Sequence, residues 1–69
     1  ISHIFNSKLD ISFTDYINAL RISKAQYLLK ETSLSITQIS YDVGFSTIRS
    51  FNRIFKSISG KTPLEYRKE

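Results

Sequence analysis

The residues best suited to chemistry in this chain are basic side chains and hydroxyls gathered in positions 46–61. Arg49, Arg53 and Lys56 follow one another at intervals of four and three residues, and no Asp or Glu interrupts the segment. In a helix this spacing places the three cations on one face. A solvated helix face usually mixes charge signs, so a face of one sign predicts an anionic partner. Guanidinium groups suit guanine edges, and hydroxyls suit phosphates, so duplex DNA fits this set.

Groups for catalysis or metal binding are scarce. His3 is the only histidine, there is no cysteine, and the only glycines are Gly44 and Gly60. A glycine-rich phosphate loop therefore cannot form. The six scattered carboxylates show no metal-ligand spacing,. We expect neither an enzyme nor a metal site, and no cofactor.

The overall charge agrees with an acidic partner. Ten Lys and Arg oppose six Asp and Glu in 69 residues, for a net charge of +4. Such a balance favours nucleic acid or an anionic membrane surface. No apolar run approaches the length of a membrane span, and no secretory signal pattern occurs. We therefore expect a cytoplasmic, nucleoid-associated protein without a membrane partner.

The elements that must position the basic residues are helices, because apolar residues recur with helical rather than alternating spacing. The longest periodic stretch, 12–31, begins at Ser12, a capping residue. Its predicted core stripe consists of Phe13, Ile17, Leu20 and Leu28, widened by Tyr16, Ala25 and Leu29. The sequence predicts an all-α fold.

Segment 35–59 reads as helix, tight turn, helix. Ser35 and Gln38 form a capping box that opens the first helix, and Gly44 ends it. Ser46 is the expected cap of a second helix over 47–59. This arrangement is the helix-turn-helix, whose second helix enters the DNA major groove.

The end of the chain carries its own helix signals. Gly60 ends the preceding helix, and Thr62, Pro63 and Glu65 open a last helix within 62–69. Lys61, Arg67 and Lys68 are expected to be solvated charges. The aromatic residues are expected to be core rather than a stacking platform; they are Phe45, Phe51, Phe55, Tyr16 and Tyr66.

The chain also contains an internal repeat. A shift of 50 residues aligns 1–16 with 51–66, with identical residues at Ile4 and Ile54 and at Phe5 and Phe55. Residues 1–11 therefore read as the end of a first helix-turn-helix. The chain then begins within a repeated unit, in keeping with its lack of methionine, and we expect uncovered apolar surface on helix 12–31.

These motifs resemble the C-terminal signature of AraC/XylS-type transcription regulators. The matching residues are Ser35, Ile36, Ile39, Ser40, Val43, Gly44, Phe45, Phe51, Asn52, Arg53, Ile54, Phe55, Lys56, Gly60, Lys61, Thr62, Pro63, Tyr66 and Arg67, and upstream Phe13, Tyr16, Arg21, Ala25, Leu28 and Leu29. Members carry two helix-turn-helix units joined by a long linker helix. The resemblance implies a homeodomain-like fold and double-stranded DNA as partner.

The resemblance assigns roles residue by residue. It implies base contacts by Ile48, Arg49, Arg53 and, in the first unit, His3. It implies phosphate contacts by Ser46, Thr47, Ser50, Asn52, Lys56 and Ser2. Arg21 could bind phosphate, but we expect it to anchor neighbouring carbonyls or acids instead. For the full-length protein, the resemblance implies RNA polymerase as a partner. It also implies an effector, dimerisation or receiver domain N-terminal to Ile1.

Two rival functions use the same features. A helical protein–protein interaction module would direct the basic helix face at an acidic protein. An amphipathic membrane-surface binder would need longer apolar faces than these short helices offer. A steep dependence of binding on salt concentration would favour DNA.

Overall fold

The computed structural model describes residues 12–69. Within that range every regular element is an α-helix, so the all-α prediction is confirmed. The helices are α2 (Phe13–Glu31), α3 (Ile36–Asp42), α4 (Ile48–Ser59) and α5 (Pro63–Lys68).

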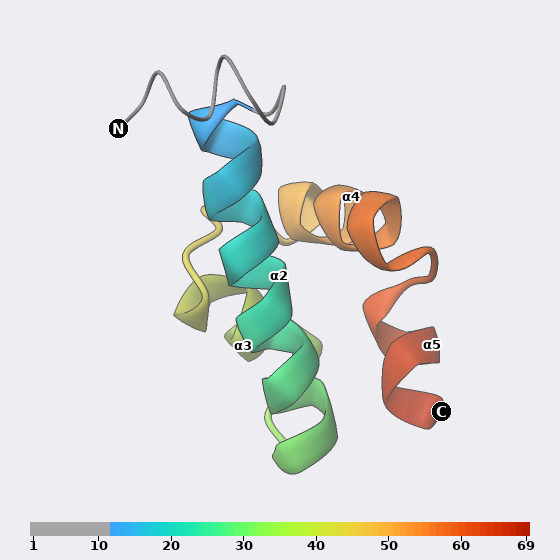
Figure 1. Cartoon of the computed structure of the whole chain (residues 1–69). Coiled ribbons are helices and arrows are strands. Elements are labelled where there is room, and N and C mark those ends of the chain that lie inside the picture. Colours follow the sequence, from blue (N-terminus) through green and yellow to red (C-terminus); the bar gives the residue numbers. More distant parts are fainter. Residues whose placement is uncertain (1–11) are drawn as a thin grey trace.

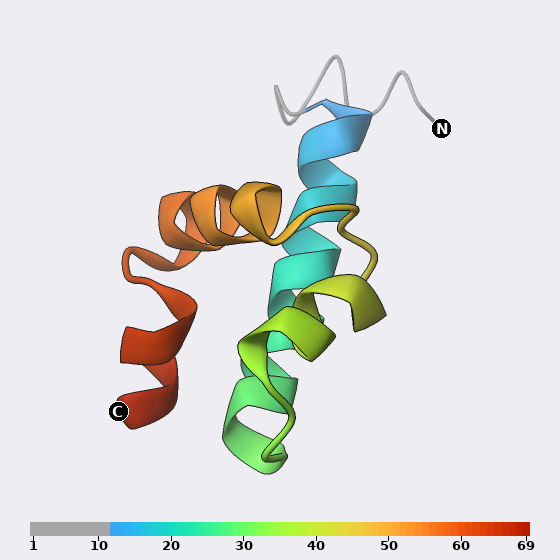
Figure 2. The same ribbon diagram turned by 180° about the vertical axis from the view of Figure 1, so that it is seen from behind.

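The long helix α2 is the support on which the other three pack (Figure 1). Helix α4 extends away from the N-terminal half of α2, and α5 returns beneath it toward the C-terminal half. Figure 2, the opposite view, shows α3 and the turn into α4 crossing in front of α2. Helices α3 and α4 therefore form the expected helix-turn-helix, braced by α2 and α5.

Each helix begins with a hydroxyl cap. Ser12, Ser35, Thr47 and Thr62 each accept a hydrogen bond from the backbone N–H three residues on. Such caps satisfy donors that have no partner within the helix. The expected cap at Ser46 is wrong by one residue: Thr47 has the extended backbone of an N-cap, so α4 begins at Ile48.

The core lies where the four helices meet. Its buried apolar residues are Ile22, Ala25, Leu29, Ile39, Val43, Phe45, Phe51 and Phe55. Four aromatic rings run through it, with 5.6 Å between successive centroids: Phe45, Phe51, Phe55 and Tyr66. These four rings belong to the core, as predicted.

The predicted core stripe of α2 is wrong in its N-terminal half. Phe13 and Leu20 are 63% and 52% exposed, Tyr16 is also exposed, and Ile22 is fully buried. The core shared with α3 and α4 takes Ile22, Ala25 and Leu29 from α2, and Phe13 and Leu20 lie outside it. Apolar residues occur on several sides of α2, and only these packed neighbours decide which side is buried. Apolar side chains of α2, among them Phe13 and Leu20, are therefore exposed.

Two glycines end helices as predicted. Gly44 and Gly60 have φ of 111° and 82°, a region that favours glycine,. At Gly44 the chain turns from α3 into the segment before α4. The N–H of Phe45 donates to the carbonyl of Ser40 across this turn at 3.0 Å.

Ser40 is a fully buried polar residue beside this turn. Its hydroxyl donates to the backbone carbonyl of Thr37 at 2.7 Å. A buried hydroxyl with a partner carries no unpaired group, so serine is accommodated at this core position.

Candidate nucleic-acid interface

The outward face of α4 carries the cluster of cations. Arg49, Arg53 and Lys56 are exposed, whereas Phe51 and Phe55 on the opposite face are fully buried. At about 100° per residue the three cations lie together on the solvent side. We call these three residues the basic face. Within residues 12–69 none of them forms an ion pair.

The start of α4 brings the other predicted contact residues together. Ser46 and Thr47 are exposed, and Ile48, the first helical residue, is half-buried. The Thr47 hydroxyl accepts from the Ser50 N–H at 3.1 Å and keeps its own hydrogen to donate. Asn52 is exposed beside the basic face. Ser2 and His3 lie outside the described residues.

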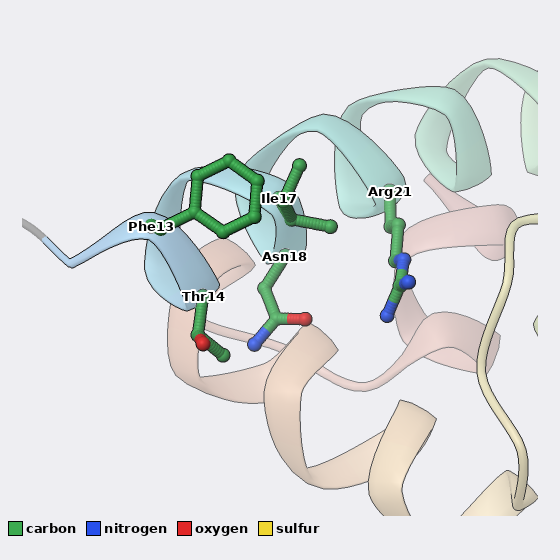
Figure 3. Close-up of a pocket in the computed structure, with 5 residues that line it drawn as sticks. All are labelled: Phe13, Thr14, Ile17, Asn18 and Arg21. Atoms are coloured by element: carbon green, nitrogen blue, oxygen red, sulfur yellow. The ribbon is translucent and has the colours of Figure 1, made fainter. Parts of the chain in front are cut away.

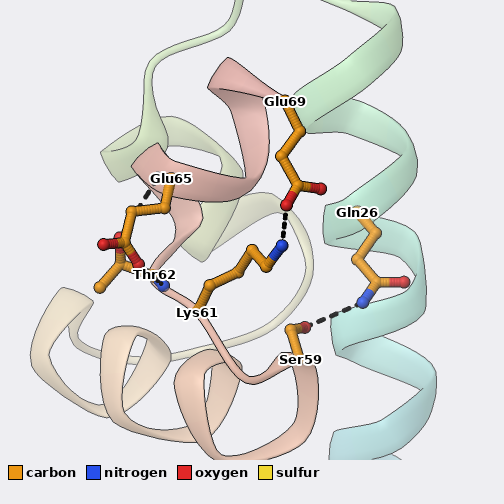
Figure 4. Close-up of polar contacts among 6 residues, drawn as sticks. All are labelled: Gln26, Ser59, Lys61, Thr62, Glu65 and Glu69. Atoms are coloured by element: carbon orange, nitrogen blue, oxygen red, sulfur yellow. Dashed lines mark hydrogen bonds and ion pairs between the residues drawn. The ribbon is translucent and has the colours of Figure 1, made fainter.

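The C-terminal end of helix α4 is tied to α2 by a hydrogen bond. Gln26 of α2 donates to the Ser59 hydroxyl at 2.8 Å (Figure 4). Beyond α4, Lys61 pairs with Glu69, which ties the two ends of the α5 segment together. The basic face therefore lies on a helix that is held by its buried residues Phe51 and Phe55 and by this bond to α2.

The capping box of α5 also sets an ionisation state. The pKa of Glu65 is lowered from its ordinary value of 4.5, first by the hydrogen bond from the Thr62 N–H and then by the Thr62 hydroxyl. Lys56 and Lys61 lower it further through their charge.

Arg67 is not a solvated charge, contrary to expectation. Its Nε donates to the carbonyl of Leu29, and a terminal nitrogen donates to the carbonyl of Thr32, both at 3.1 Å. These carbonyls lie at the end of α2, where helix carbonyls lack partners and a cation is favoured. Helix α2 ends without a glycine, which was the one sequence signal that its carbonyls needed another partner.

Arg21 was expected to anchor a carbonyl or an acid, and the structure gives it a different contact. Its guanidinium lies over the Phe45 ring, 5.5 Å from the centroid. Its Nε is also close to Gly44, 3.0 Å from where a Cβ would stand. Arg21 therefore packs on the turn that leads into α4.

Among residues 12–69, no helix is both long and apolar enough to cross a membrane. These residues also contain no group of three His, Cys, Asp or Glu side chains placed to hold a metal ion.

Comparison with known proteins places this geometry in a family. The whole chain, residues 1–69, matches the profile of a family described as a helix-turn-helix domain. It is 42% identical over 66 residues to the Msm operon regulatory protein of Streptococcus mutans, and 37% identical over 67 residues to the arabinose operon regulatory protein of Escherichia coli. The chain belongs to the AraC/XylS family.

The matches cover nearly all of this chain but only a small part of each relative. The alignments include 96% and 97% of this chain but only 24% and 23% of those two regulators. The chain thus spans about a quarter of the length of these curated relatives. The relatives are transcription regulators rather than enzymes.

Solved AraC-type domains share the fold. An AraC-type transcriptional regulator from Chromobacterium violaceum superimposes with a TM-score of 0.90 at 33% identity, covering 97% of this chain and 60% of that one. The C-terminal domain of AraT, a response regulator from Geobacillus stearothermophilus, gives 0.88 at 36% identity, covering 97% and 55%. The chain is therefore an AraC-type helix-turn-helix domain in both sequence and fold.

Proposed function

We propose that this domain binds double-stranded DNA sequence-specifically, with α4 in the major groove. The observation that carries the proposal is the basic face, whose three exposed cations project from the helix that follows a helix-turn-helix turn. A major groove admits one α-helix, and a second helix in this position is the one that enters it. The family membership supports DNA as the partner.

Different residues contact the DNA bases and the DNA backbone. Arg49 and Arg53 lie one helical turn apart and read base edges, while Ile48 contacts a thymine methyl group. Backbone contacts set the position of the domain on the duplex without reading sequence. These phosphate contacts come from Ser46, Thr47, Ser50, Asn52 and Lys56. His3 and Ser2 keep their proposed base and phosphate roles.

For the full-length protein we extend the proposal through the family resemblance. Two recognition helices, each from one helix-turn-helix, enter successive major grooves about 34 Å apart. An N-terminal effector, dimerisation or receiver domain controls the protein, and bound protein acts on RNA polymerase. This activity belongs to the cytoplasm, at the nucleoid.

The decisive variant is Arg53→Ala, measured against a panel of duplexes that differ at single base pairs. Loss of one bidentate base contact costs about 1–3 kcal/mol on the preferred site and relaxes preference at one position. An equal loss on every duplex contradicts base reading by Arg53.

Lys56→Ala is the matched variant on the same face. A lost phosphate contact weakens binding to all duplexes alike and lowers the slope of log affinity against log salt by about 1. A changed base preference contradicts the phosphate role of Lys56. If the wild-type domain binds no duplex with steep salt dependence, the proposed function itself is wrong and a protein partner replaces DNA.

A further inference from the structure

A concavity on the side of α2 has no role in the interface described above. Its volume is about 440 Å³, and its lining residues all belong to α2: Phe13, Thr14, Ile17, Asn18 and Arg21. Thr14, Asn18 and Arg21 follow at helical intervals, so they share one face. Figure 3 shows their polar ends pointing the same way from the helix. The concavity therefore combines a hydroxyl, an amide and a guanidinium.

The guanidinium is held in place before any ligand arrives. Arg21 lies over the Phe45 ring, which is itself in the core, and against the backbone at Gly44. Stacking on an aromatic face fixes the plane of a guanidinium and leaves its edge free to donate. Less side-chain freedom is then lost when that edge binds a ligand.

The donors of this site are unused within the domain. Among residues 12–69, the side chains of Thr14, Asn18 and Arg21 make no hydrogen bond, and Arg21 forms no ion pair. No carboxylate lines the concavity. Arg21 is half-buried and its donors are free within residues 12–69, which suits an oxyanion. A guanidinium fits a phosphate with two parallel hydrogen bonds.

The position of the site indicates which oxyanion binds there. Arg21 contacts Gly44 and Phe45, and the next two residues are Ser46 and Thr47, which lead into α4. The site thus adjoins the turn that leads into the proposed DNA interface, which is rich in cations and hydroxyls. We propose that Arg21, assisted by Thr14 and Asn18, binds a phosphodiester group of the DNA backbone beside α4. This inference rests on the proposed function and adds a contact from α2.

The test compares Arg21→Gln with wild type on duplexes that each carry one uncharged methylphosphonate linkage. Loss of a charge-assisted contact weakens binding to unmodified duplex about tenfold. The salt slope falls by about 0.9, the contribution of one phosphate. At one linkage position, the methylphosphonate should weaken DNA binding by the wild type but leave DNA binding by Arg21→Gln unchanged. Lys30→Gln makes the same change of charge on α2 but on the opposite side of the helix, where Lys30 lies over the Tyr66 ring,. It should keep the wild-type slope and the wild-type sensitivity.

Asn18→Ala keeps Arg21 and its packing, so it tests the site even if Arg21→Gln folds poorly. It weakens binding about threefold, as loss of a neutral hydrogen bond does, and reduces sensitivity at the same linkage. If Arg21→Gln unfolds more readily but keeps the wild-type salt slope and methylphosphonate pattern, Arg21 only packs and the inference is wrong. If, instead, these variants bind like wild type while Arg53→Ala and Lys56→Ala weaken binding, the proposed function stands and this inference fails. Absence of duplex binding by wild type overturns both.

Discussion

Gly44 is the residue on which the helix-turn-helix depends most directly. Its φ of 111° strains any residue with a side chain, and a Cβ there would stand 3.0 Å from Arg21 Nε. We expect Gly44→Ala to lower the free energy of unfolding by about 2–3 kcal/mol. Urea denaturation measures this loss.

Gly60 provides the matched control for that substitution. It also has a positive φ, of 82°, but no atom lies within 4 Å of a Cβ there. Gly60→Ala should therefore lose only about 1 kcal/mol, the cost of the left-handed backbone alone. Equal losses at the two glycines would show that the contact with Arg21 adds nothing.

Glu65 makes the stability of α5 depend on pH. Its pKa is lowered in the folded chain, chiefly by the Thr62 N–H, from the ordinary value of 4.5. A lowered folded pKa means that the carboxylate stabilises the fold above the unfolded pKa, and that this contribution is lost as pH falls through the folded pKa.

The corresponding variant is Glu65→Gln, which keeps an acceptor but does not titrate. Between neutral pH and the acid range below 4.5, its stability should fall less steeply than that of wild type,. Unfolding midpoints at a series of pH values measure the difference. Parallel curves for the two proteins would show that Glu65 contributes no pH dependence.

At the scale of an element, α2 has two apolar sides that differ in what covers them. Leu29 is 2% exposed and belongs to the core, whereas Leu20 is 52% exposed on the same helix. We expect Leu29→Ala to cost about 2–5 kcal/mol because it removes buried surface and leaves a cavity. Leu20→Ala should change stability by about 0.5 kcal/mol or less. Thermal unfolding of the pair measures both, and a comparable loss at Leu20 would mean that a partner covers that side.

At the scale of the whole molecule, Arg67 joins the last helix to the end of the first described one. Its two hydrogen bonds reach carbonyls 38 and 35 residues away in the chain. Arg67→Met should lower the free energy of unfolding by about 1–3 kcal/mol, the range for hydrogen bonds to a charged group.

Lys68→Met is the control, because Lys68 is an exposed cation on the same short helix. It should change stability by about 0.5 kcal/mol or less. Arg67 lies off the basic face, so its variant, once folded, should retain the base preference of wild type. A stable Arg67→Met protein with altered base preference would assign Arg67 to the DNA interface instead.

Features that depend on a few neighbouring residues were predictable from the amino-acid sequence. Hydroxyl caps, glycine stops and the one-sided charge of α4 could all be read from spacing, because each rests on bonds or sterics within about one helical turn. Even the misplaced cap at Ser46 missed its helix by a single residue, since Ser46 and Thr47 both carry a suitable hydroxyl.

Which side of α2 is buried, and which groups Arg21 and Arg67 contact, depends on how the helices pack in the folded chain. Apolar residues lie on more than one side of α2, so periodicity left the choice open until α3 and α4 packed on Ile22 and Leu29. The partners of Arg21 and Arg67 lie 23 or more residues away in the chain. Because these side chains are long and flexible, the residues next to them in the sequence do not indicate what they contact. Local chemistry thus specified the recognition helix, while packing between distant segments fixed the support that presents it.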